Sequence, residues 1–406
     1  MNIVLFYPSL VSDWNNGHAH FLRGIVTELQ ALGQRVEVFE PADGWSLGNL
    51  RSEHGEAALA GFSAAYPHLR SRFYDPNTLD PAAWLADADL VIVHEWNDPA
   101  LVSALGRERA RGGRYRLLFH DTHHRAVTDP AAIARLDLRH YDGVLAFGRV
   151  LRDLYLERGW AARAWTWHEA ADVRVFRTFP EAVKEGDLVW IGNWGDEERT
   201  RELHEFLLGP ARRLRLRARV HGVRYPEEAR RALAEAGIDY GGWLPNHAVP
   251  RAFAAFRVTV HIPRRPYAEA LPGIPTIRPF EALACGIPLI SSPWEDAEGL
   301  FRTGRDFLVA RHGREMETLL RDVLNDPELA RSLSEQGLGT VRARHTCAHR
   351  AAELLAIGAE LGLEGAAIDG SVAEPMAFDR RQEQQLAGQP AAAAVSGTGP
   401  AFARSR

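Results

Sequence analysis

The feature that most constrains the fold of this chain is the alternation of short apolar runs with segments of helical periodicity. Residues 3–7 (IVLFY) are continuously apolar, and residues 21–29 carry apolar side chains three and four positions apart. Residues 36–39 then have the composition of a second strand. A continuous apolar run is typical of a parallel strand that is covered on both faces, and amphipathic spacing between two strands indicates a helix. The chain therefore begins with a βαβ unit of an open, parallel α/β sheet.

This alternation runs through most of the chain in two series. The sequence predicts further strands at 90–93, 117–119 and 144–147, and then at 188–192, 214–220, 258–262, 288–291 and 307–309. A polar, proline-containing stretch at 177–186 separates the two series and is interpreted as a hinge. Two Rossmann-like parallel α/β domains that face a cleft are therefore expected, at 1–178 and 179–355, with ligands at the carboxyl ends of the strands. The segment 356–406 is predicted to be mostly disordered from about residue 370, because it is rich in Ala, Gly, Gln and Pro without periodicity.

Charge and composition exclude several classes of function. The net charge of −5 provides no general attraction to nucleic acid. The two cysteines cannot form a disulfide framework, and no apolar run approaches the roughly 18 residues of a membrane span. No signal-like apolar core is seen at the N-terminus, so a cytoplasmic protein is expected. Alternating arginines at 213–219 predict one polar face of a half-exposed strand and leave open a weak contact with an anionic membrane surface.

The stretch 273–292 (GIPTIRPFEALACGIPLISS) has the character of a binding loop. A short helix is predicted to begin near Ile277 and to carry Arg278 and Glu281. The start of a helix presents unpaired N–H groups and a partial positive charge, which suits an anionic diphosphate, and Arg278 could add charge-assisted hydrogen bonds. The alternative is that Glu281 only stabilises the helix dipole, with Arg278 as its solvated neighbour.

The segment EALACGIP, which begins at Glu281, resembles glycosyltransferases of the GT-B fold, close to glycosyltransferase family 4 and the spore-maturation-protein-like group. The resemblance implies an acceptor-binding first domain, a nucleotide-sugar-binding second domain and a last helix that crosses back to the first domain. It implies that Glu281 accepts hydrogen bonds from the ribose and that the backbone near Ile277 and Arg278 meets the diphosphate. The donor-binding residues implied in this way are Gly17, Arg199, Arg201, Thr276, Ile277, Arg278, Phe280 and Glu281.

One position departs from the family pattern. The family has a second acid eight residues before the one that Glu281 matches, and here that position is Gly273. Glu269 lies nearby and is a candidate substitute. The departure puts the donor-sugar contact in question and keeps a non-catalytic binding protein open as an alternative.

Polar residues follow two predicted strands of the first domain. His120, Asp121, His123 and His124 follow the strand at 117–119, and related enzymes place a histidine there beside the transferred sugar. The implied catalytic residues are His120, Asp121 and Arg278. A metal site in this segment is not expected, because the i, i+3, i+4 spacing of its histidines is helical whereas a loop is predicted. The residues expected to bind the acceptor are His94, Glu95, Trp96, His123 and His124.

The resulting hypothesis is a glycosyltransferase that moves a sugar from a nucleotide-diphosphate sugar to an unidentified acceptor. By resemblance the reaction retains the anomeric configuration and requires neither a metal nor a cofactor. A nucleotide-sugar epimerase of the same fold and a non-catalytic nucleotide-sugar-binding protein remain as alternatives.

Overall fold

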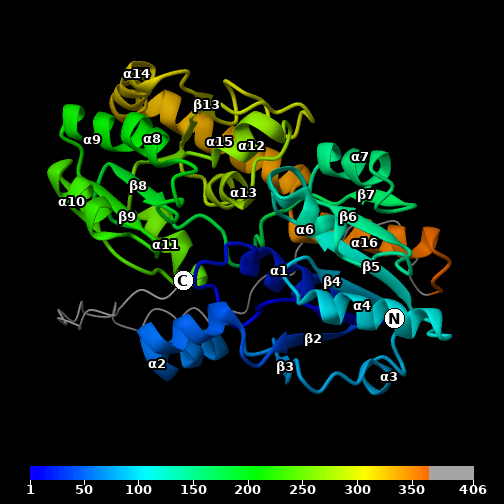
Figure 1. Cartoon of the computed structure of the whole chain (residues 1–406). Coiled ribbons are helices and arrows are strands. Elements are labelled where there is room, and N and C mark those ends of the chain that lie inside the picture. Colours follow the sequence, from blue (N-terminus) through cyan, green and yellow to red (C-terminus); the bar gives the residue numbers. More distant parts are fainter. Residues whose placement is uncertain (365–406) are drawn as a thin grey trace. The chain divides into compact units, whose positions relative to one another are not determined.

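The computed structural model describes residues 1–364, which contain two parallel β-sheets (Figure 1). The first sheet has seven strands in the order β3-β2-β1-β4-β5-β6-β7. These strands are β1 (Asn2–Phe6), β2 (Arg35–Pro41), β3 (Ser71–Tyr74), β4 (Leu90–His94), β5 (Arg116–Asp121), β6 (Gly143–Ala146) and β7 (Ala164–Thr166). Every strand pair is parallel, and His94 of β4 lies opposite His120 of β5. The strands end at one edge of the sheet, where polar residues gather.

The second sheet has six parallel strands in the order β10-β9-β8-β11-β12-β13. They are β8 (Leu188–Ile191), β9 (Ala218–His221), β10 (Ile238–Tyr240), β11 (Val258–His261), β12 (Leu289–Ser291) and β13 (Leu308–Val309). Residues 167–187 join the two sheets without a helix or strand. The prediction of two Rossmann-like parallel α/β domains is confirmed.

Helices connect most successive strands in both halves, although β12 and β13 are joined without one. Those of the first half are α1 (His18–Ala31), α2 (Trp45–Ala65), α3 (Pro81–Trp84), α4 (Pro99–Ala110), α5 (Arg125–Thr128), α6 (Pro130–Ala134) and α7 (Arg149–Glu157). Those of the second half are α8 (Thr200–Leu203), the π-helix η1 (His204–Leu208), α9 (Gly209–Leu214), α10 (Glu227–Glu235), the 3-10 helix η2 (Asn246–Ala248), α11 (Val249–Ala254), α12 (Arg265–Ala270), α13 (Ile277–Ala284), α14 (Gly313–Asn325), α15 (Pro327–Arg344) and α16 (Cys347–Glu360). Within residues 1–364, none of the helices is both long enough and apolar enough to pass through a bilayer.

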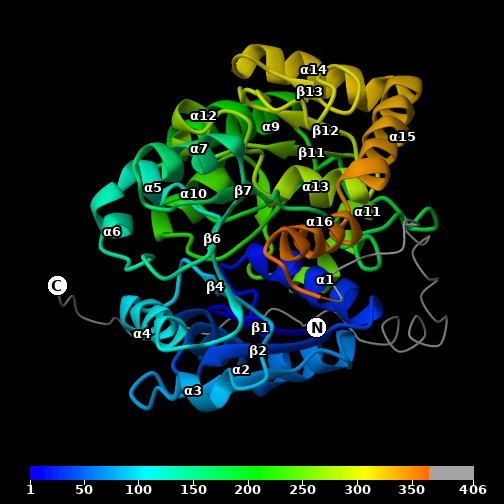
Figure 2. The same ribbon diagram turned by 90° about the vertical axis from the view of Figure 1, so that its right-hand side faces the viewer.

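The last described helix returns to the first sheet. α16 lies beside α1 in both views (Figures 1 and 2), and its buried face joins the core that β1 and α1 build. The two helices meet closely because Gly24 of α1 has no side chain: a Cβ there would lie 2.4 Å from Cys347 Sγ. The backbone of Ala171 pairs with His345 and Cys347, which fixes the entry to α16. The crossing-back of the last helix agrees with the expectation from the resemblance.

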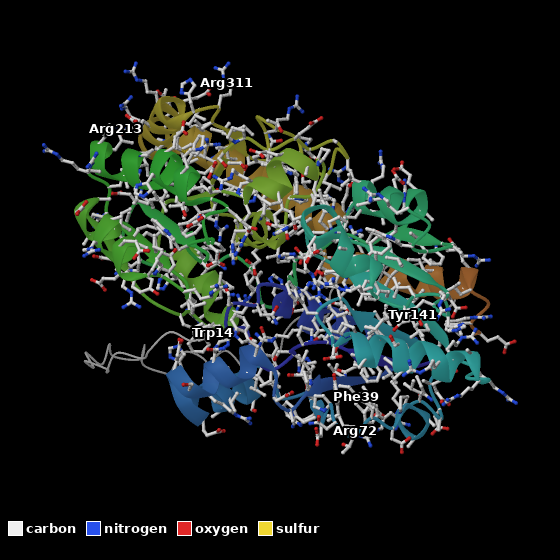
Figure 3. The ribbon with its side chains drawn as sticks, viewed as in Figure 1. Trp14, Phe39, Arg72, Tyr141, Arg213 and Arg311 are labelled. Carbon is white, nitrogen blue, oxygen red and sulfur yellow. The ribbon has the colours of Figure 1, made fainter. Side chains whose placement is uncertain are left out.

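The prediction of a strand at 214–220 is wrong in its first half. Leu214 ends α9, Arg215 adopts a left-handed conformation (φ 53°), and β9 begins only at Ala218. The arginines at 213–219 therefore do not share one strand face. Arg213 lies on the outer surface of α9 and pairs with Glu317 (Figure 3). The alternation of arginines with apolar residues is typical of a strand, but Arg213 and Leu214 belong to α9, a helix that includes Pro210.

Candidate active site

Three histidines and a tyrosine meet at the carboxyl edge of the first sheet. Tyr7 follows β1, His94 ends β4, His120 lies near the end of β5, and His18 is the first residue of α1. The rings of His18 and His94 have centroids 4.8 Å apart, and those of His18 and His120 are 5.4 Å apart. The Tyr7 hydroxyl lies 2.7 Å from His120 Nδ1, and His18 Nδ1 lies 3.1 Å from Glu169 Oε1. Strands β1, β4 and β5 are neighbours in the sheet, so residues more than 100 positions apart become adjacent.

Burial controls the charge of these groups. Removal from water lowers the pKa of His94 and His120 well below the usual value, and the neighbouring His18 adds to both shifts. Both imidazoles are therefore neutral near pH 7. Burial also raises the pKa of Tyr7, so its hydroxyl keeps its proton. Tyr7, His94 and His120 are thus neutral, buried hydrogen-bonding groups at this edge of the sheet.

Two acids behind this edge have partners within the first half. Arg125 donates to Glu95 Oε2 from Nε and Nη2, at 3.1 and 2.8 Å. Asp121 accepts from the Tyr155 hydroxyl at 2.8 Å and from the His123 backbone N–H at 3.0 Å. Burial raises the pKa of both carboxyl groups. The sequence predicted acceptor binding for Glu95 and catalysis for Asp121. Both carboxyl groups are buried, and their hydrogen bonds hold the loop after β5 in place.

Trp96, which follows Glu95, is far more accessible than the two acids. Trp96 is 49% exposed, with the Arg125 guanidinium 4.0 Å from its ring centroid. The ring of His123 lies beside Trp96, and that of His124 lies 5.1 Å from Tyr267 of α12. The acceptor-binding role predicted for His94, Trp96, His123 and His124 remains a prediction, and Trp96 is the member that offers an open aromatic face.

Arginines gather at the carboxyl ends of β8 and β11. Arg199 Nη2 and Arg264 Nη2 both donate to Asn193 Oδ1, at 2.7 and 3.2 Å. Burial and the nearby charge of Arg264 lower the pKa of Arg199 to about 9, which still leaves it charged at neutral pH. Burial lowers the pKa of His261 to about 3, with further contributions from Arg199 and Arg278. Arg199 and Arg264 thus share Asn193, and the charge of Arg278 acts on both Arg199 and His261; these three arginines are here called the arginine cluster.

The start of α13 lies against the first half of the chain. Thr276 precedes the helix with φ 59°, and its side chain does not cap the first turn. A non-glycine residue in this region stores strain of about 1–3 kcal/mol, and such strain is common at ligand sites. Gly17 fits against the helix start, since a Cβ there would lie 3.2 Å from the Ile277 side chain. Among the predicted donor-binding residues, Gly17 thus lies against Ile277 at the helix start, and the charge of Arg278 in the same first turn acts on Arg199.

Two predicted donor-binding residues lie elsewhere. The Arg201 side chain is 74% exposed and pairs with Glu202 on α8. The Phe280 ring is buried in the core of the second half, 5.3 Å from the ring of Phe301. The structure does not bring these two side chains to the arginine cluster.

Glu281 connects the two halves of the chain. Its carboxylate is fully buried and contacts His20 Nδ1 at 2.7 Å, the Arg278 guanidinium and Asn246 Nδ2 at 3.4 Å. His20 Nε2 accepts from the Asp172 backbone N–H at 2.7 Å, so in the neutral ring Nδ1 carries the proton and donates to Glu281. The ribose-binding role of Glu281 remains a prediction, and its carboxylate already has three partners.

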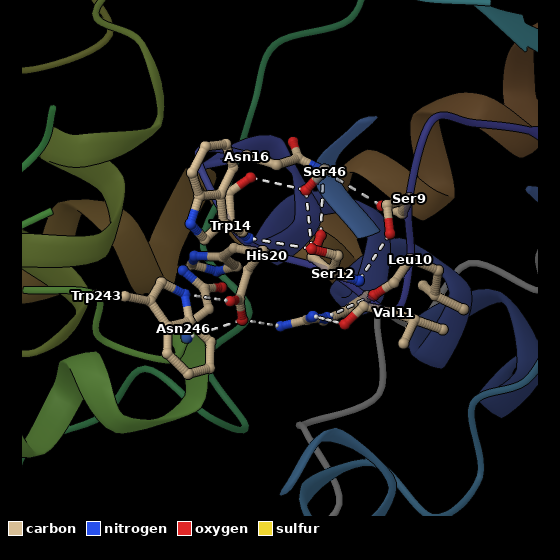
Figure 4. Close-up of polar contacts among 12 residues, drawn as sticks. Ser9, Leu10, Val11, Ser12, Trp14, Asn16, His20, Ser46, Trp243 and Asn246 are labelled. Carbon is tan, nitrogen blue, oxygen red and sulfur yellow. Dashed lines mark hydrogen bonds and ion pairs between the residues drawn. The ribbon is translucent and has the colours of Figure 1, made fainter. Parts of the chain in front are cut away.

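The loop between β1 and α1 makes a second connection, which Figure 4 shows. Asp13 accepts hydrogen bonds from Arg23 within the first half and from Trp243 Nε1 and the Asn246 backbone N–H in the second half, at 2.9, 3.1 and 2.9 Å. Asn193 Nδ2 also donates to Asn15 Oδ1 at 2.7 Å. Sequence reasoning missed Asp13, His20 and Asn246. The pair His18 and His20 at the predicted helix start was the signal that could have indicated His20.

An acid from another segment lies beside Gly273. Gly273 has φ 92°, and a Cβ there would lie 2.6 Å from Glu298 Cγ. Glu298 accepts from the Arg149 backbone N–H at 2.6 Å and contacts His168 Nε2 at 3.2 Å. Glu269, the substitute suggested by the sequence, is exposed on α12. The carboxylate nearest to Gly273 among these candidates therefore comes from Glu298.

Comparisons with known proteins agree with this architecture. The family model described as "Glycosyl transferase-like" matches residues 199–356. Sucrose-phosphate synthase from Thermosynechococcus elongatus is similar over 89% of this chain and 99% of its own, with 16% identity and a TM-score of 0.61. Anabaena HepE in complex with UDP and glucose is similar over 87% of this chain and 98% of its own, with 14% identity and a TM-score of 0.64.

A third solved structure extends the comparison. The phage T4 enzyme BGT in complex with its UDP-glucose substrate is similar over 89% of this chain and all of its own, with 13% identity and a TM-score of 0.57. No curated protein matches the chain in sequence. The chain therefore has the two-domain fold of these glycosyltransferases, and its residues 199–356 match the glycosyl transferase-like family model.

Proposed function

We propose that this protein is a glycosyltransferase that takes its sugar from a nucleotide-diphosphate sugar. The arginine cluster carries this proposal, because it places positive charge at the carboxyl ends of β8 and β11, next to the uncapped start of α13. A diphosphate suits this combination of guanidinium groups and helix N–H groups. The uridine nucleotides bound in the structures of HepE and BGT make UDP-glucose the first donor to test.

The arrangement suggests how the donor is accommodated. Arg278 pairs with Glu281 and also belongs to the arginine cluster. When the diphosphate binds, Arg278 exchanges its contact with Glu281 for one with phosphate oxygens. Glu281 Oε2 then becomes free to accept a hydrogen bond from a ribose hydroxyl. This exchange reconciles the enclosed carboxylate with the role that its sequence motif predicts.

Catalysis follows from where charge develops. As the glycosidic bond breaks, the departing diphosphate gains negative charge, which the arginine cluster stabilises more strongly in the transition state than in the ground state. We propose that this replaces a divalent metal at the phosphates and that the anomeric configuration is retained. His120, a neutral imidazole at the carboxyl edge of the first sheet, contacts the transferred sugar. The acceptor binds on the side of Trp96 and His123.

The test is release of free nucleotide from UDP-, GDP- and TDP-sugars, with and without a panel of acceptors. Arg264→Met and Arg278→Met should weaken donor binding by about 10–100-fold, because each charge-assisted hydrogen bond contributes about 1.5–3 kcal/mol. Arg201→Met is the matched control: it removes an exposed arginine from the adjoining helix and should leave donor binding unchanged.

The outcomes separate the alternatives. Acceptor-dependent nucleotide release that persists in EDTA, with an anomeric configuration in the product that NMR finds unchanged, supports the proposal. Donor binding without turnover under any condition would identify a non-catalytic binding protein. Conversion of the free nucleotide-sugar without an acceptor would identify an epimerase.

A further inference from the structure

His18, His94 and His120 have the composition of a metal-binding site. Each can offer one imidazole nitrogen, and the three nitrogens lie within 4.8 Å of one another. His94 and His120 are almost completely buried, and the His18 side chain is 11% exposed. We propose that these three histidines bind one divalent transition-metal ion, with zinc as the foremost candidate. Imidazole ligands favour zinc, copper and nickel over magnesium and calcium.

Two of these rings have unused hydrogen-bonding capacity. Among the described residues, His18 Nε2 and His120 Nε2 are buried and have no hydrogen-bond partner. Buried polar atoms in folded proteins nearly always have a partner, so two orphaned nitrogens at one place require an explanation. A metal ion that accepts both lone pairs supplies it.

The opposite nitrogens of the same two rings are held as in known metal sites. His18 Nδ1 contacts the Glu169 carboxylate at 3.1 Å, and His120 Nδ1 contacts the Tyr7 hydroxyl at 2.7 Å. Metal-bound histidines commonly donate their other N–H to a carboxylate or another oxygen, which fixes the ring and the tautomer. A proton on Nδ1 of each ring leaves its Nε2 lone pair available to the ion.

His94, the third ligand, must give up an existing hydrogen bond in order to bind the ion. His94 Nε2 lies 3.0 Å from Thr122 Oγ1, and His94 Nδ1 accepts from the Trp96 backbone N–H at 3.3 Å. Zinc–nitrogen bonds of about 2.0–2.1 Å place two nitrogens on a tetrahedral ion roughly 3.4 Å apart, so the widest pair of nitrogens has to close by at most about 1.4 Å. Rotation of the His18 ring, the least buried of the three, contributes to this closure.

Three histidine ligands leave a fourth position for water or for an oxygen of a ligand, as in catalytic zinc sites. The cluster lies at the carboxyl edge of the first sheet, whereas the arginine cluster belongs to the second sheet. The proposed transfer reaction needs no metal at the phosphates, but His120 belongs to both proposals, so the two are tested by separate measurements. The test of the metal site measures metal binding alone and does not use enzyme activity.

The experiment uses the full-length, untagged chain after treatment with a chelator. Zinc is titrated against a chromophoric competitor, and cobalt is added separately to record its visible absorption spectrum. One ion per chain should bind with a dissociation constant of about 1 μM or lower, and cobalt should give the intense bands of a tetrahedral site with nitrogen ligands. His18→Gln and His120→Gln should each weaken binding by at least about tenfold, and Glu169→Gln by about tenfold.

The matched control is His123→Gln, which removes a histidine from the loop after β5 without removing one of the three ligands, and it should bind like the wild type. Circular dichroism of each variant establishes that it is folded. If His120→Gln fails to fold, His18→Gln and Glu169→Gln decide the question. The proposal is refuted if the wild type binds no stoichiometric ion, or if both of those variants bind as tightly as the wild type.

Discussion

The contact between α1 and α16 gives a prediction whose magnitude follows from the structure. In Gly24→Ala, the new Cβ would start 2.4 Å from Cys347 Sγ and 2.8 Å from Asp172 Cβ. The distances to both atoms must grow by about 1 Å, and such overpacking typically costs about 1–3 kcal/mol. Alanine recovers about 0.5–1 kcal/mol in a helix interior. The net destabilisation of the contact therefore lies between about 0 and 2.5 kcal/mol, and we expect the middle of this range, about 1–2 kcal/mol.

The Cys347 thiol reports this contact directly. It is buried, and burial raises its pKa, so it should react slowly with a disulfide reagent. A loss of about 1–2 kcal/mol increases the population in which α16 is detached by about 5–30-fold. The rate of Cys347 labelling, measured by mass spectrometry to separate it from Cys285, should rise by that factor. Gly339→Ala in α15 is the control, because a Cβ there meets nothing within 4 Å, and its labelling rate should stay unchanged.

A Gly24→Ala protein that labels at the wild-type rate would refute the reasoning. The substitution would then be accommodated without loosening α16, and the close approach of the two helices would not constrain the chain. Equal acceleration in Gly339→Ala would also contradict it, because the effect would then not depend on the contact.

Two further predictions concern the arginine cluster and the response to pH. Asn193→Ala removes the amide oxygen that accepts hydrogen bonds from both Arg199 and Arg264. The two guanidinium groups are then no longer held in place, and the affinity for UDP-glucose should fall by about tenfold in a calorimetric titration. Burial lowers the pKa of His345 to about 4. Between pH 6.5 and 4 this histidine therefore binds a proton in the unfolded chain but not in the folded chain. The free energy of unfolding consequently falls as the pH drops from about 6.5 toward 4. In His345→Gln, which can keep the contact with Leu300 O, thermal unfolding measured at each pH should show a shallower decline in this range, by up to about 1.4 kcal/mol per pH unit. An unchanged slope would mean that another group carries the pH dependence.

The sequence predicted most strands of both sheets because each is a continuous apolar run. The strand expected at 90–93 is β4 (Leu90–His94), and the one expected at 258–262 is β11 (Val258–His261). The edge strands β3, β7 and β10 were missed because they are short and only partly buried, so they lack that signal. The stretch at 214–220 was misread because arginines alternate with apolar residues both before and after a left-handed turn.

The candidate site was only partly predictable. The loop at 273–281 and the polar residues after β4 and β5 could be located, because helix starts and the carboxyl ends of parallel strands have recognisable sequences. The partners of these residues could not be identified. Glu281 meets His20, which lies 261 positions away, and the three clustered histidines come from α1, β4 and β5.

The sequence by itself thus determined the class of fold and the segments that supply polar groups, since apolar periodicity and helix-start chemistry are local properties. Only the tertiary structure decided which of those groups meet. The order of strands in each sheet, and the contacts of α1 and the loop after β1 with the second half, bring distant residues within hydrogen-bonding distance. Burial at those places then sets their charge, and burial is a property of the packed molecule that no single segment carries.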